Sequence, residues 1–511
     1  MPADVMPAPP WSLDDFERPW PLHDAQQSRR VEGAAAASLP PHTLMQRAGL
    51  SVARLALAIA PHAQRIWIAA GPGNNGGDGL EAALHLRRAG KEVSVSLAGD
   101  AAALPADAAT SLQRARLAGV PIDEAVSAPA GCDLVIDALL GLGATRPPDG
   151  ALALLARAIN ASAGVRLAID LPSGLAADTG APLGDPSVRA THTLSLLTLK
   201  PGLFTGLGRE LAGALWFDDL GCGAGAATTP PRALLGDADG ARHLRRARSH
   251  AGHKGGFGDV LAVGGAPGMS GALTLAARAA LAGGAGRVFA SALDPAMPAH
   301  DALAPELMWR PQFWTTPPSQ WSQATVVCGC GGGHAVREAL PVLLSRSARL
   351  VLDADALNAI ATDTPLQSLL VARASRGLAT VLTPHPLEAA RLLALSGADK
   401  VQSNRLAAAQ SLAHRFDCTV LLKGSGSVIA APRRVAVINP TGNARLASAG
   451  TGDVLAGWLA GLWSASAAGG SPAHAFEAAC AAAYWHGAAA QPGDAASPLS
   501  ASALIAALSR T

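Results

Sequence analysis

The chain has 511 residues, which is too long for one ordinary domain and favours two. Forty basic and thirty-eight acidic residues give a formal net charge of +2, so no basic surface points to nucleic acid as a partner. The six cysteines include no Cys-x-x-Cys pair, which is typical of reduced thiols in a cytoplasmic protein and not of a disulfide framework or a zinc site.

Two segments bear on targeting and membrane insertion. Residues 1–20 form a Pro-rich lead that we expect to be flexible, and no cationic segment precedes an apolar core, so we expect no secretory signal. The uncharged stretch 454–476 is strongly apolar only in its first half and ends in a Gly-Gly-Ser-Pro turn. It therefore predicts a buried helix and no contact with a membrane.

The first half of the chain opens with a helical pattern over residues 24–60. An apolar run at 66–70 predicts a buried strand, which leads into a loop at 71–79 with five glycines, two asparagines and an aspartate. Helical residues to Ala89 and a strand at 93–97 follow. A glycine loop between strand and helix is the setting in which backbone N–H groups hold a phosphate. The spacing differs from the dinucleotide fingerprint, so ordinary NAD binding is not predicted.

Polar side chains follow two further predicted strands. Asp137 and Asp170 each come directly after an apolar run, and Ser173 follows shortly. Ligands of open α/β sheets gather at the carboxyl ends of strands, so we expect Asn75, Asp137 and Ser173 around one point. Amide, carboxylate and hydroxyl oxygens suit an alkali or alkaline-earth cation better than zinc. Asp170 is then available for proton transfer, although either aspartate alone could be a helix or turn cap.

Four segments of the first half, 44–49, 71–79, 137–147 and 170–180, closely resemble the NAD(P)H-hydrate epimerases, also called the YjeF N-terminal domain. The similarity extends over nearly the whole first half. It implies a Rossmann-like three-layer α/β/α domain, which we place at residues 21–225.

The same resemblance implies roles for individual residues. Asp170 is expected to contact the substrate as the acid/base near the reacting carbon. A potassium ion is expected on Asn75, Asp137 and Ser173. The hydrated dinucleotide is expected to contact Asn74, Asn75, Gly76, Gly77, Asp78, Gly141, Leu142, Gly143, Ala144, Thr145, Arg146, Pro147 and Asp170.

The two halves are joined by a stretch of different composition. Residues 222–248 are rich in glycine, alanine and proline and then strongly basic, as in an interdomain connection. We therefore expect a linker at 226–245 and a second domain at 246–511.

The second half alternates apolar runs with helical stretches. Strands are expected at 260–263, 324–328, 350–353, 380–383 and 419–423. This alternation predicts a mostly parallel sheet with helices on both faces.

The stretch 449–457 is the most informative motif of the second half, because glycines there lead into an apolar helix. Gly450 and Gly452 let the backbone approach a ligand closely, and the N–H groups that open the helix suit an anion. Asp453 could be a helix cap or a base beside a phosphate. Together with Lys423, which precedes a Gly-Ser-Gly loop, these residues match the ribokinase-like pattern, whose chemistry is phosphoryl transfer.

Within that superfamily the second half resembles the ADP-dependent NAD(P)H-hydrate dehydratases, the YjeF C-terminal domain. The matching segments are 253–258, 270–272, 353–358, 383–388, 423–424 and 439–457. The resemblance implies a ribokinase-like α/β/α domain in which the hydrate faces Ala272, Gly333, His385 and Asp453. It implies that the adenine nucleotide faces Lys423, Gly424, Ser425, Gly426, Ser427 and Gly452. His385 taken alone would more often be a capping residue in a loop.

One loop departs from the pattern of this family. The family usually has a proline and a larger residue within loop 329–333, where this chain has Cys330 and Gly332. Cys328 and Cys330 could suggest a metal site. No second cysteine pair exists, so packing within a loop is the favoured interpretation.

The two resemblances together predict a metabolite-repair enzyme. The first domain would interconvert the R and S epimers of hydrated NADH or NADPH, and the second would dehydrate the S form with ADP as co-substrate. Magnesium is expected from the phosphoryl chemistry. The expected partners are these small molecules and further copies of the chain, in a homo-oligomer. The alternative is a kinase for a vitamin-precursor alcohol, joined to a non-catalytic binding module.

Overall fold

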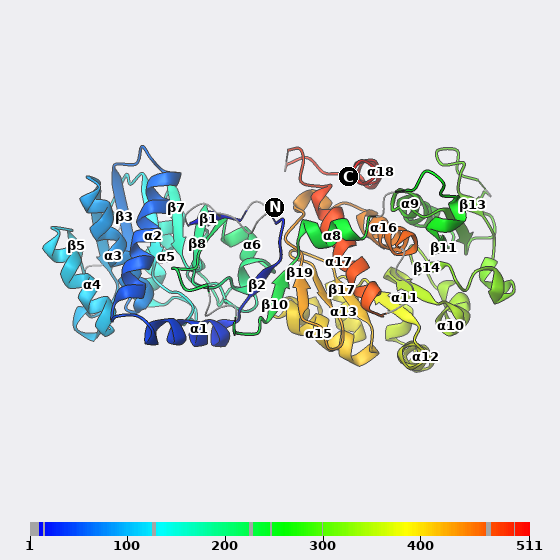
Figure 1. The fold of residues 1–511 in the computed structure, drawn as a ribbon, viewed down its shortest axis with the longest axis horizontal. Coiled ribbons are helices and arrows are strands. Elements are labelled where there is room, and N and C mark those ends of the chain that lie inside the picture. The colour runs from blue at the N-terminus through cyan, green and yellow to red at the C-terminus, as the bar shows by residue number, and fades with distance from the viewer. Residues whose placement is uncertain are drawn as a thin grey trace. The chain divides into compact units, whose positions relative to one another are not determined.

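The computed structural model describes residues 10–13, 16–124, 129–223, 228–245, 248–298, 300–466, 472–494 and 496–511. The chain divides into two compact units, one of Met1–Asp15 and Trp20–Ala233, the other of Phe16–Pro19 and Leu234–Thr511. Each unit contains a largely parallel sheet with helices packed on it, so the predicted two-domain α/β class is confirmed (Figure 1).

The first unit contains the elements up to β9. Its strands are β1 (Trp11–Ser12), β2 (Trp20–Leu22), β3 (Arg65–Ala70), β4 (Glu92–Leu97), β5 (Ile122–Asp123), β6 (Leu134–Ala138), β7 (Val165–Ile169), β8 (His192–Leu196) and β9 (Ala214–Asp218). The described helices are α1 (Ala25–Ala37), α2 (Thr43–Ile59), α3 (Asn74–Arg88), α4 (Ala106–Leu117), α5 (Gly150–Ala161) and α6 (Gly208–Leu211), with 3-10 helices η1 (Ala101–Ala103) and η2 (Pro201–Leu203).

The second unit contains the remaining elements. Its strands are β10 (Ala233–Leu235), β11 (Asp259–Gly264), β12 (Arg287–Ala292), β13 (Met308–Trp309), β14 (Thr325–Cys328), β15 (Arg349–Leu352), β16 (Ala379–Leu382), β17 (Thr419–Leu422), β18 (Val428–Ala430) and β19 (Ala436–Ile438). The described helices are α8 (Ala238–His243), α9 (Ser270–Ala282), α10 (Val336–Arg346), α11 (Ala354–Ala361), α12 (Thr364–Ser375), α13 (Pro386–Leu392), α14 (Ala398–Gln402), α15 (Arg405–Phe416), α16 (Thr451–Ala465), α17 (Pro472–Ala488) and α18 (Ala501–Leu508). Its 3-10 helices are η3 (Lys254–Phe257), η4 (Phe313–Thr315), η5 (Pro318–Gln320) and η6 (Ala444–Leu446).

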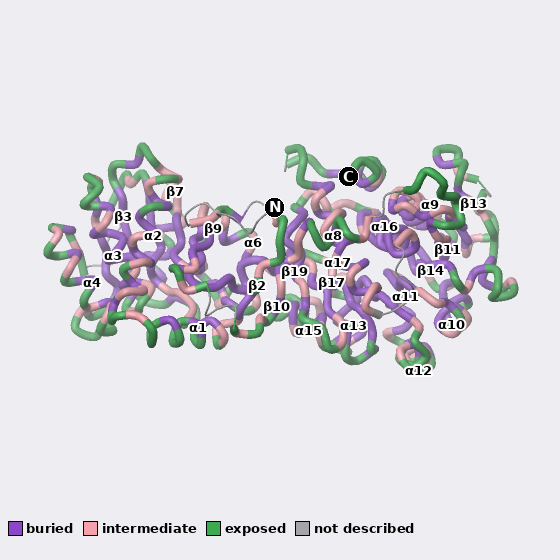
Figure 2. Tube along the Cα trace, viewed as in Figure 1, coloured by how far each residue is buried: buried purple, intermediate pink, exposed green. Residues whose placement is uncertain are grey.

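The first sheet has the strand order β1-β9-β8-β7-β6-β3-β4-β5, and its pairings are parallel except that of β1 with β9. Apolar residues cover both of its faces. Ile66 and Ile68 of β3 pack with α2, α3 and α4, whereas Trp67 and Ala69 of the same strand pack with α5. A sheet buried on both faces is the middle layer of three, as predicted. Figure 2 shows this burial in purple along the strands.

The strands of the second unit follow one another in the sheet in the order β13-β12-β11-β14-β15-β16-β17-β18-β19-β10, parallel from β13 to β17 and antiparallel from β17 to β19. Val260 and Ala262 of β11 pack with α9, α16 and α17. Helices α12 and α15 contact β16 and β17 and lie on the other side of the sheet (Figure 1). All five strands predicted for this half are present within two residues of their predicted ends, because buried apolar runs bounded by polar residues define them.

The glycine-rich segment 71–79 differs from its prediction as a loop, because α3 already begins at Asn74. Its glycines are required by packing. A Cβ at Gly76 would lie 1.9 Å from the carbonyl oxygen of Gly71, and one at Gly79 would lie 2.5 Å from the Cβ of Ala138. The glycines therefore bring the first turns of α3 against the ends of β3 and β6.

The boundary between the units also differs from its prediction. The segment expected to be a linker, 226–245, contains β10, which joins the second sheet, and α8, which packs on α17. Residues 224–227 lie outside the described part. Within the expected N-terminal lead, Phe16–Pro19 belongs to the second unit, where Glu17 forms an ion pair with Arg242 of α8. Arg242, one of the basic residues of the expected linker, is thus paired with an acidic side chain.

The uncharged stretch 454–476 forms most of α16 and the start of α17, while residues 467–471 lie outside the described part. Over the described ranges, each helix is too short or too polar to cross a bilayer. Instead α16 is buried and packs directly on α9. A Cβ at Gly457 would lie 2.0 Å from the carbonyl oxygen of Ala276, and one at Gly461 would lie 2.3 Å from that of Ala280. The two helices are therefore in backbone contact.

This contact makes Gly457→Ala a test of the packing. The added methyl group has no space beside Ala276, so we expect the free energy of unfolding to fall by about 1–3 kcal/mol or more. Urea unfolding followed by circular dichroism measures the change. Gly33→Ala in α1 is the matched control, because a Cβ there meets nothing within 4 Å. Equal stability of both variants would contradict the backbone contact.

Candidate functional sites

A cavity of about 610 Å³ lies in the first unit at the carboxyl ends of its strands. Strand β3 pairs with β4 on one side and with β6 on the other, so the chain changes direction here, and ligands of α/β sheets bind at such points. Of the predicted substrate contacts, the cavity is lined by Asn74, Asn75, Asp78, Gly141, Leu142, Gly143, Ala144 and Asp170. The predicted contacts outside this lining are Gly76, Gly77, Thr145, Arg146 and Pro147.

Asp170 lies at the end of β7 in a left-handed conformation, with φ of 66°, which is unusual for a residue other than glycine. One carboxylate oxygen forms an ion pair with the ammonium of the buried Lys200 and accepts a hydrogen bond from the N–H of Leu196 at 3.2 Å. Lys200 also donates to the carbonyl oxygen of Leu196 at 2.8 Å. The side chain of Asp170 is thus held in one orientation at the cavity.

Asp137 and Ser173 are in direct contact, as predicted from the two strand ends. The Ser173 hydroxyl donates to one oxygen of Asp137 at 2.6 Å, and the Ser173 N–H donates to the other at 2.8 Å. Burial raises the pKa of Asp137 to about 6, although these hydrogen bonds oppose the shift. Asn75 approaches the same region, because a Cβ at Gly141 would lie 3.1 Å from its amide oxygen, and its Nδ2 is buried without a partner.

Four acidic side chains lie together at this cavity, although they are not adjacent in the sequence. Glu32, Asp78, Asp107 and Asp170 all line it. Burial raises the pKa of Asp78 well above its usual value, and the charges of Asp170 and Glu32 raise it further. The protonated form of Asp78 is therefore favoured more than that of an ordinary aspartate.

Lys200 is a functional candidate to which the sequence alone assigns no role. Its place after β8, the strand beside β7, was the available signal, because the carboxyl ends of both strands meet at one edge of the sheet. Glu32 comes from α1, and nothing in its sequence context pointed to the cavity.

In the second unit, Asp353 and Lys423 form a largely buried ion pair at the ends of β15 and β17. The Lys423 ammonium donates to Asp353 at 2.6 Å, and the Thr383 hydroxyl donates to the same oxygen at 2.9 Å. Burial alone would lower the pKa of Lys423, but the charges of Asp353 and Glu388 outweigh burial and raise it. A Cβ at Gly452 would lie 3.5 Å from the Lys423 ammonium. Two predicted nucleotide contacts are therefore neighbours.

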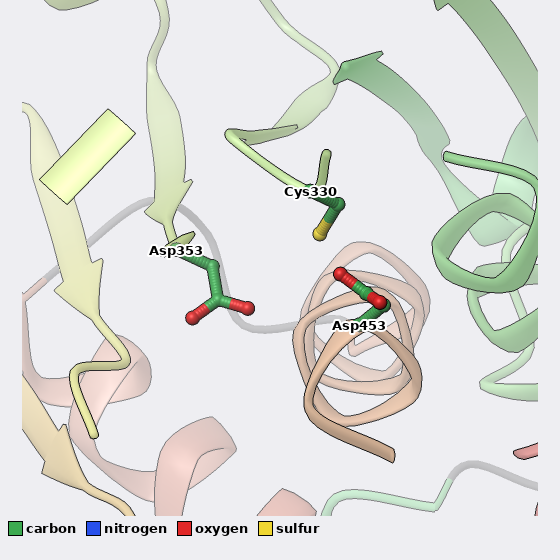
Figure 3. A group of neighbouring side chains, drawn as sticks. All are labelled: Cys330, Asp353 and Asp453. Carbon is green, nitrogen blue, oxygen red and sulfur yellow. The ribbon is translucent and has the colours of Figure 1, made fainter. Parts of the chain in front are cut away.

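Asp453 lies in the first turn of α16, which begins after Gly450 at a positive φ of 83°. Burial raises the pKa of Asp453 to about 6, and the charge of Asp353 adds to the shift. The Cys330 thiol, whose pKa burial also raises, lies within 4.8 Å of a carboxylate oxygen of Asp453 and opposes the upward shift of the Asp453 pKa. Figure 3 shows that Cys330, Asp353 and Asp453 come from three different segments and point toward one another.

His385 caps α13, as its residue type alone suggested. Its Nδ1 accepts hydrogen bonds from the N–H groups of Leu387 at 3.1 Å and Glu388 at 3.3 Å. Its Nε2 lies 3.2 Å from the carboxylate of Glu388, whose pKa is raised to about 7 by burial and by the charge of Asp353. The imidazole is thus fixed at the same edge of the sheet as Lys423, with 45% of its side chain exposed.

The glycine loop 329–333 contains Gly333 and contacts Ala272, the other two residues predicted to face the hydrate. A Cβ at Gly331 would lie 2.9 Å from the Cβ of Ala272, so the loop touches the start of α9. The N–H of Gly333 donates to Asp355 at 2.8 Å.

Residues 424–427 form the turn between β17 and β18, and the Ser427 hydroxyl donates to the carbonyl oxygen of Gly424 at 3.2 Å. Ser425 and Gly426 occupy the same turn, directly after Lys423.

The buried ion pair gives a prediction about stability. Lys423→Met should lower the free energy of unfolding by about 3–5 kcal/mol, because it leaves the charge of Asp353 buried and unpaired. Adding Asp353→Asn should recover part of the lost free energy of unfolding, because it removes the unpaired charge. Arg116→Met is the control, since Arg116 and Glu124 are each about half exposed, and it should change stability by roughly 0–1 kcal/mol. Equal effects of both methionine variants in chemical unfolding would count against the buried pair.

Comparison with known proteins covers both units. A family model described as YjeF-related protein N-terminus matches residues 41–202, and one described as NAD(P)H-hydrate dehydratase matches residues 260–506. A structure described as an ADP/ATP-dependent NAD(P)H-hydrate dehydratase from Bacillus subtilis, co-crystallised with ATP and Mg²⁺, is 28% identical with a TM-score of 0.44. It covers 53% of this chain and 95% of its own.

Full-length relatives carry both parts in one chain. The bifunctional NAD(P)H-hydrate repair enzyme of Escherichia coli is 34% identical over 92% of this chain and 88% of its own. That of Moorella thermoacetica is 38% identical over 83% of this chain and 84% of its own. The chain therefore belongs to the family of bifunctional NAD(P)H-hydrate repair enzymes.

Proposed function

We propose that this chain repairs NADH and NADPH that have taken up water across a ring double bond. The first unit interconverts the R and S epimers of the hydrate. The second converts S-hydrate and ADP into reduced nicotinamide, AMP and phosphate. The observation that carries the proposal is that each unit has a lysine–aspartate ion pair at the carboxyl edge of its sheet, Lys200 with Asp170 and Lys423 with Asp353. In the second unit, a carboxylate oxygen of Asp453 lies within 4.8 Å of one of Asp353.

In the first unit, Asp170 is the group that contacts the reacting carbon. Its oxygen is oriented by Lys200 and by the N–H of Leu196, so proton transfer needs no rearrangement of the side chain. Asp78 lines the same cavity, and the upward shift of its pKa by burial makes it our candidate for the proton donor. Asn74 and the loop 141–144 bind the rest of the hydrated dinucleotide.

A potassium ion fits the donor set of Asn75, Asp137 and Ser173. The Asp137 carboxylate is buried, and the hydrogen bonds described for it come from neutral groups. Its raised pKa is the feature expected where a hard cation belongs, because the positive charge would stabilise the buried carboxylate. Potassium would supply positive charge that keeps Asp137 ionised and fixes the loop at Gly141.

In the second unit, the S-hydrate hydroxyl attacks the terminal phosphate of ADP, and Asp453 accepts the hydroxyl proton. The Lys423 ammonium and the N–H groups at the start of α16 neutralise charge on the phosphate. Turn 424–427 and Gly452 hold the nucleotide. Elimination of the new phosphate then restores the ring double bond. Ala272, Gly333 and His385 position the nicotinamide ring.

Magnesium fits the site of the second unit because more carboxylates than positively charged side chains lie there. Asp353 and Glu388 share Lys423. Burial is the main cause of the raised pKa values of Glu388 and Asp453, and the negative charge of Asp353 adds to both shifts. Asp353 and Glu388 would hold the ion together with nucleotide phosphates, where it would supply charge neutralisation. We also propose a cytoplasmic homo-oligomer, on the basis of the thiol content and the family.

A mixture of R- and S-hydrates, incubated with ADP and followed by chromatography, tests both assignments in one assay. Asp453→Asn should leave both epimers unconsumed while their exchange continues, because it lacks the base for phosphoryl transfer. Asp170→Asn should consume S-hydrate and leave R-hydrate behind. We expect losses of about 100-fold or more in the affected step, typical of a missing acid/base.

Two outcomes would contradict the proposal. A stable phosphorylated product with no released phosphate would favour the alternative kinase. Binding of hydrate without epimer exchange would make the first unit a binding module. Circular dichroism of each variant serves as the control for folding.

Potassium gives a separate prediction with a readout in stability. The pKa of Asp137 in the fold, about 6, exceeds the usual 3.8, so its ionised form costs roughly 3 kcal/mol above pH 6, and this cost falls gradually as the pH falls from 6 to 3.8. A bound cation relieves that cost. Potassium chloride should therefore raise the melting temperature more at pH 8 than at pH 5, relative to choline chloride at equal ionic strength. Asp137→Asn should abolish the difference, and its persistence there would exclude this site.

A further inference from the structure

Cys330 gives the second unit a side chain that the predicted chemistry does not use. It lies in the loop after β14, and only 2% of it is exposed. Its sulfur and one carboxylate oxygen each of Asp353 and Asp453 all lie within 4.8 Å of one another. Figure 3 shows the three side chains directed into a common space from the β14 loop, the end of β15 and the start of α16.

The separation of these atoms is close to that of a metal site. Tetrahedral zinc, with bonds of about 2.3 Å to sulfur and about 2.0 Å to oxygen, holds its ligand atoms roughly 3.3–3.5 Å apart. Side-chain rotations that bring the three atoms about 1 Å closer would complete three of the four positions. Water or a phosphate oxygen would fill the fourth.

The surrounding charge favours a cation independently of the thiol. Asp353, Asp355, Glu388 and Asp453 meet at this edge of the sheet, where Lys423 provides the neighbouring positive charge. The ligand types then select the metal. Magnesium takes oxygen ligands in octahedral geometry, whereas a thiolate with two carboxylates suits zinc or cobalt.

We propose that Cys330, Asp353 and Asp453 form a binding site for a thiophilic divalent cation such as Zn²⁺, which inhibits the second unit. On binding, the Cys330 sulfur releases its proton to solvent and bonds to the metal, and Asp353 exchanges the Lys423 ammonium for the metal. Asp453 then can no longer accept a proton from a substrate. The inhibition, though not the binding, rests on the function proposed above.

Cobalt binding to the full-length protein, without nucleotide, tests the site directly. A thiolate ligand gives Co²⁺ a sulfur-to-metal charge-transfer band in the near ultraviolet, and Zn²⁺ should remove this band by displacement. Cys330→Ala should lose the band and weaken Co²⁺ binding by about tenfold or more. Cys330→Ser, which preserves the volume of the side chain, should also lose the band. Cys132→Ser, a partly exposed cysteine of the other unit, should keep it.

Activity provides the second measurement. Zn²⁺ should inhibit dehydration of S-hydrate by the parent enzyme, and about tenfold more metal should be needed with Cys330→Ser, while epimer exchange is unaffected. A band that persists in folded Cys330→Ser, or no band in the parent protein, would overturn the site. A cobalt band in a parent protein without dehydratase activity would support the site and refute only the proposed function.

Discussion

Backbone contact between the loops that follow neighbouring parallel strands is the constraint on which both sites depend. In the first unit a Cβ at Gly71 would lie 1.8 Å from the carbonyl oxygen of Leu139, and in the second a Cβ at Gly329 would lie 1.9 Å from that of Asp353. Glycine at both positions lets each loop touch the loop of the adjacent strand. Polar residues from separate strands therefore converge within hydrogen-bonding distance.

Both sites also place a buried lysine against an aspartate at a strand end. Neither ion pair adds much to stability, since removing two charges from water costs about as much as their attraction returns. Each ion pair instead holds a positively charged lysine in a fixed position where an anionic substrate would bind. Each unit thus has a lysine–aspartate ion pair at its site, although the two sheets are different. The pairs are Lys200 with Asp170 and Lys423 with Asp353.

The strands and the contact of Asp137 with Ser173 could be predicted from the sequence, because apolar runs that end in aspartate or glycine fix both the strand and its polar neighbour. The start of α3 could not be predicted, because a glycine such as Gly76 is typical of a loop, whereas here it allows close packing of the helix. The sequence favours loop packing for the thiol of Cys330 because it has no second cysteine pair, whereas the two carboxylates near the thiol, Asp353 and Asp453, are distant from it along the chain. The pairing of β14 with β15 and the packing of α16 on these strands bring the three side chains together, and the local sequence pattern predicts neither.

The backbone contact of α16 with α9 limits how the second site can move. Asp453 opens one of these helices and Ala272 lies in the first turn of the other, while Gly457 and Gly461 leave no gap between them. Sliding of one helix along the other would force carbonyl oxygens into neighbouring atoms. Helices α9 and α16 consequently behave as a single rigid body. Closure around a substrate would therefore have to come from other segments of the site, such as the turns at His385 and 424–427.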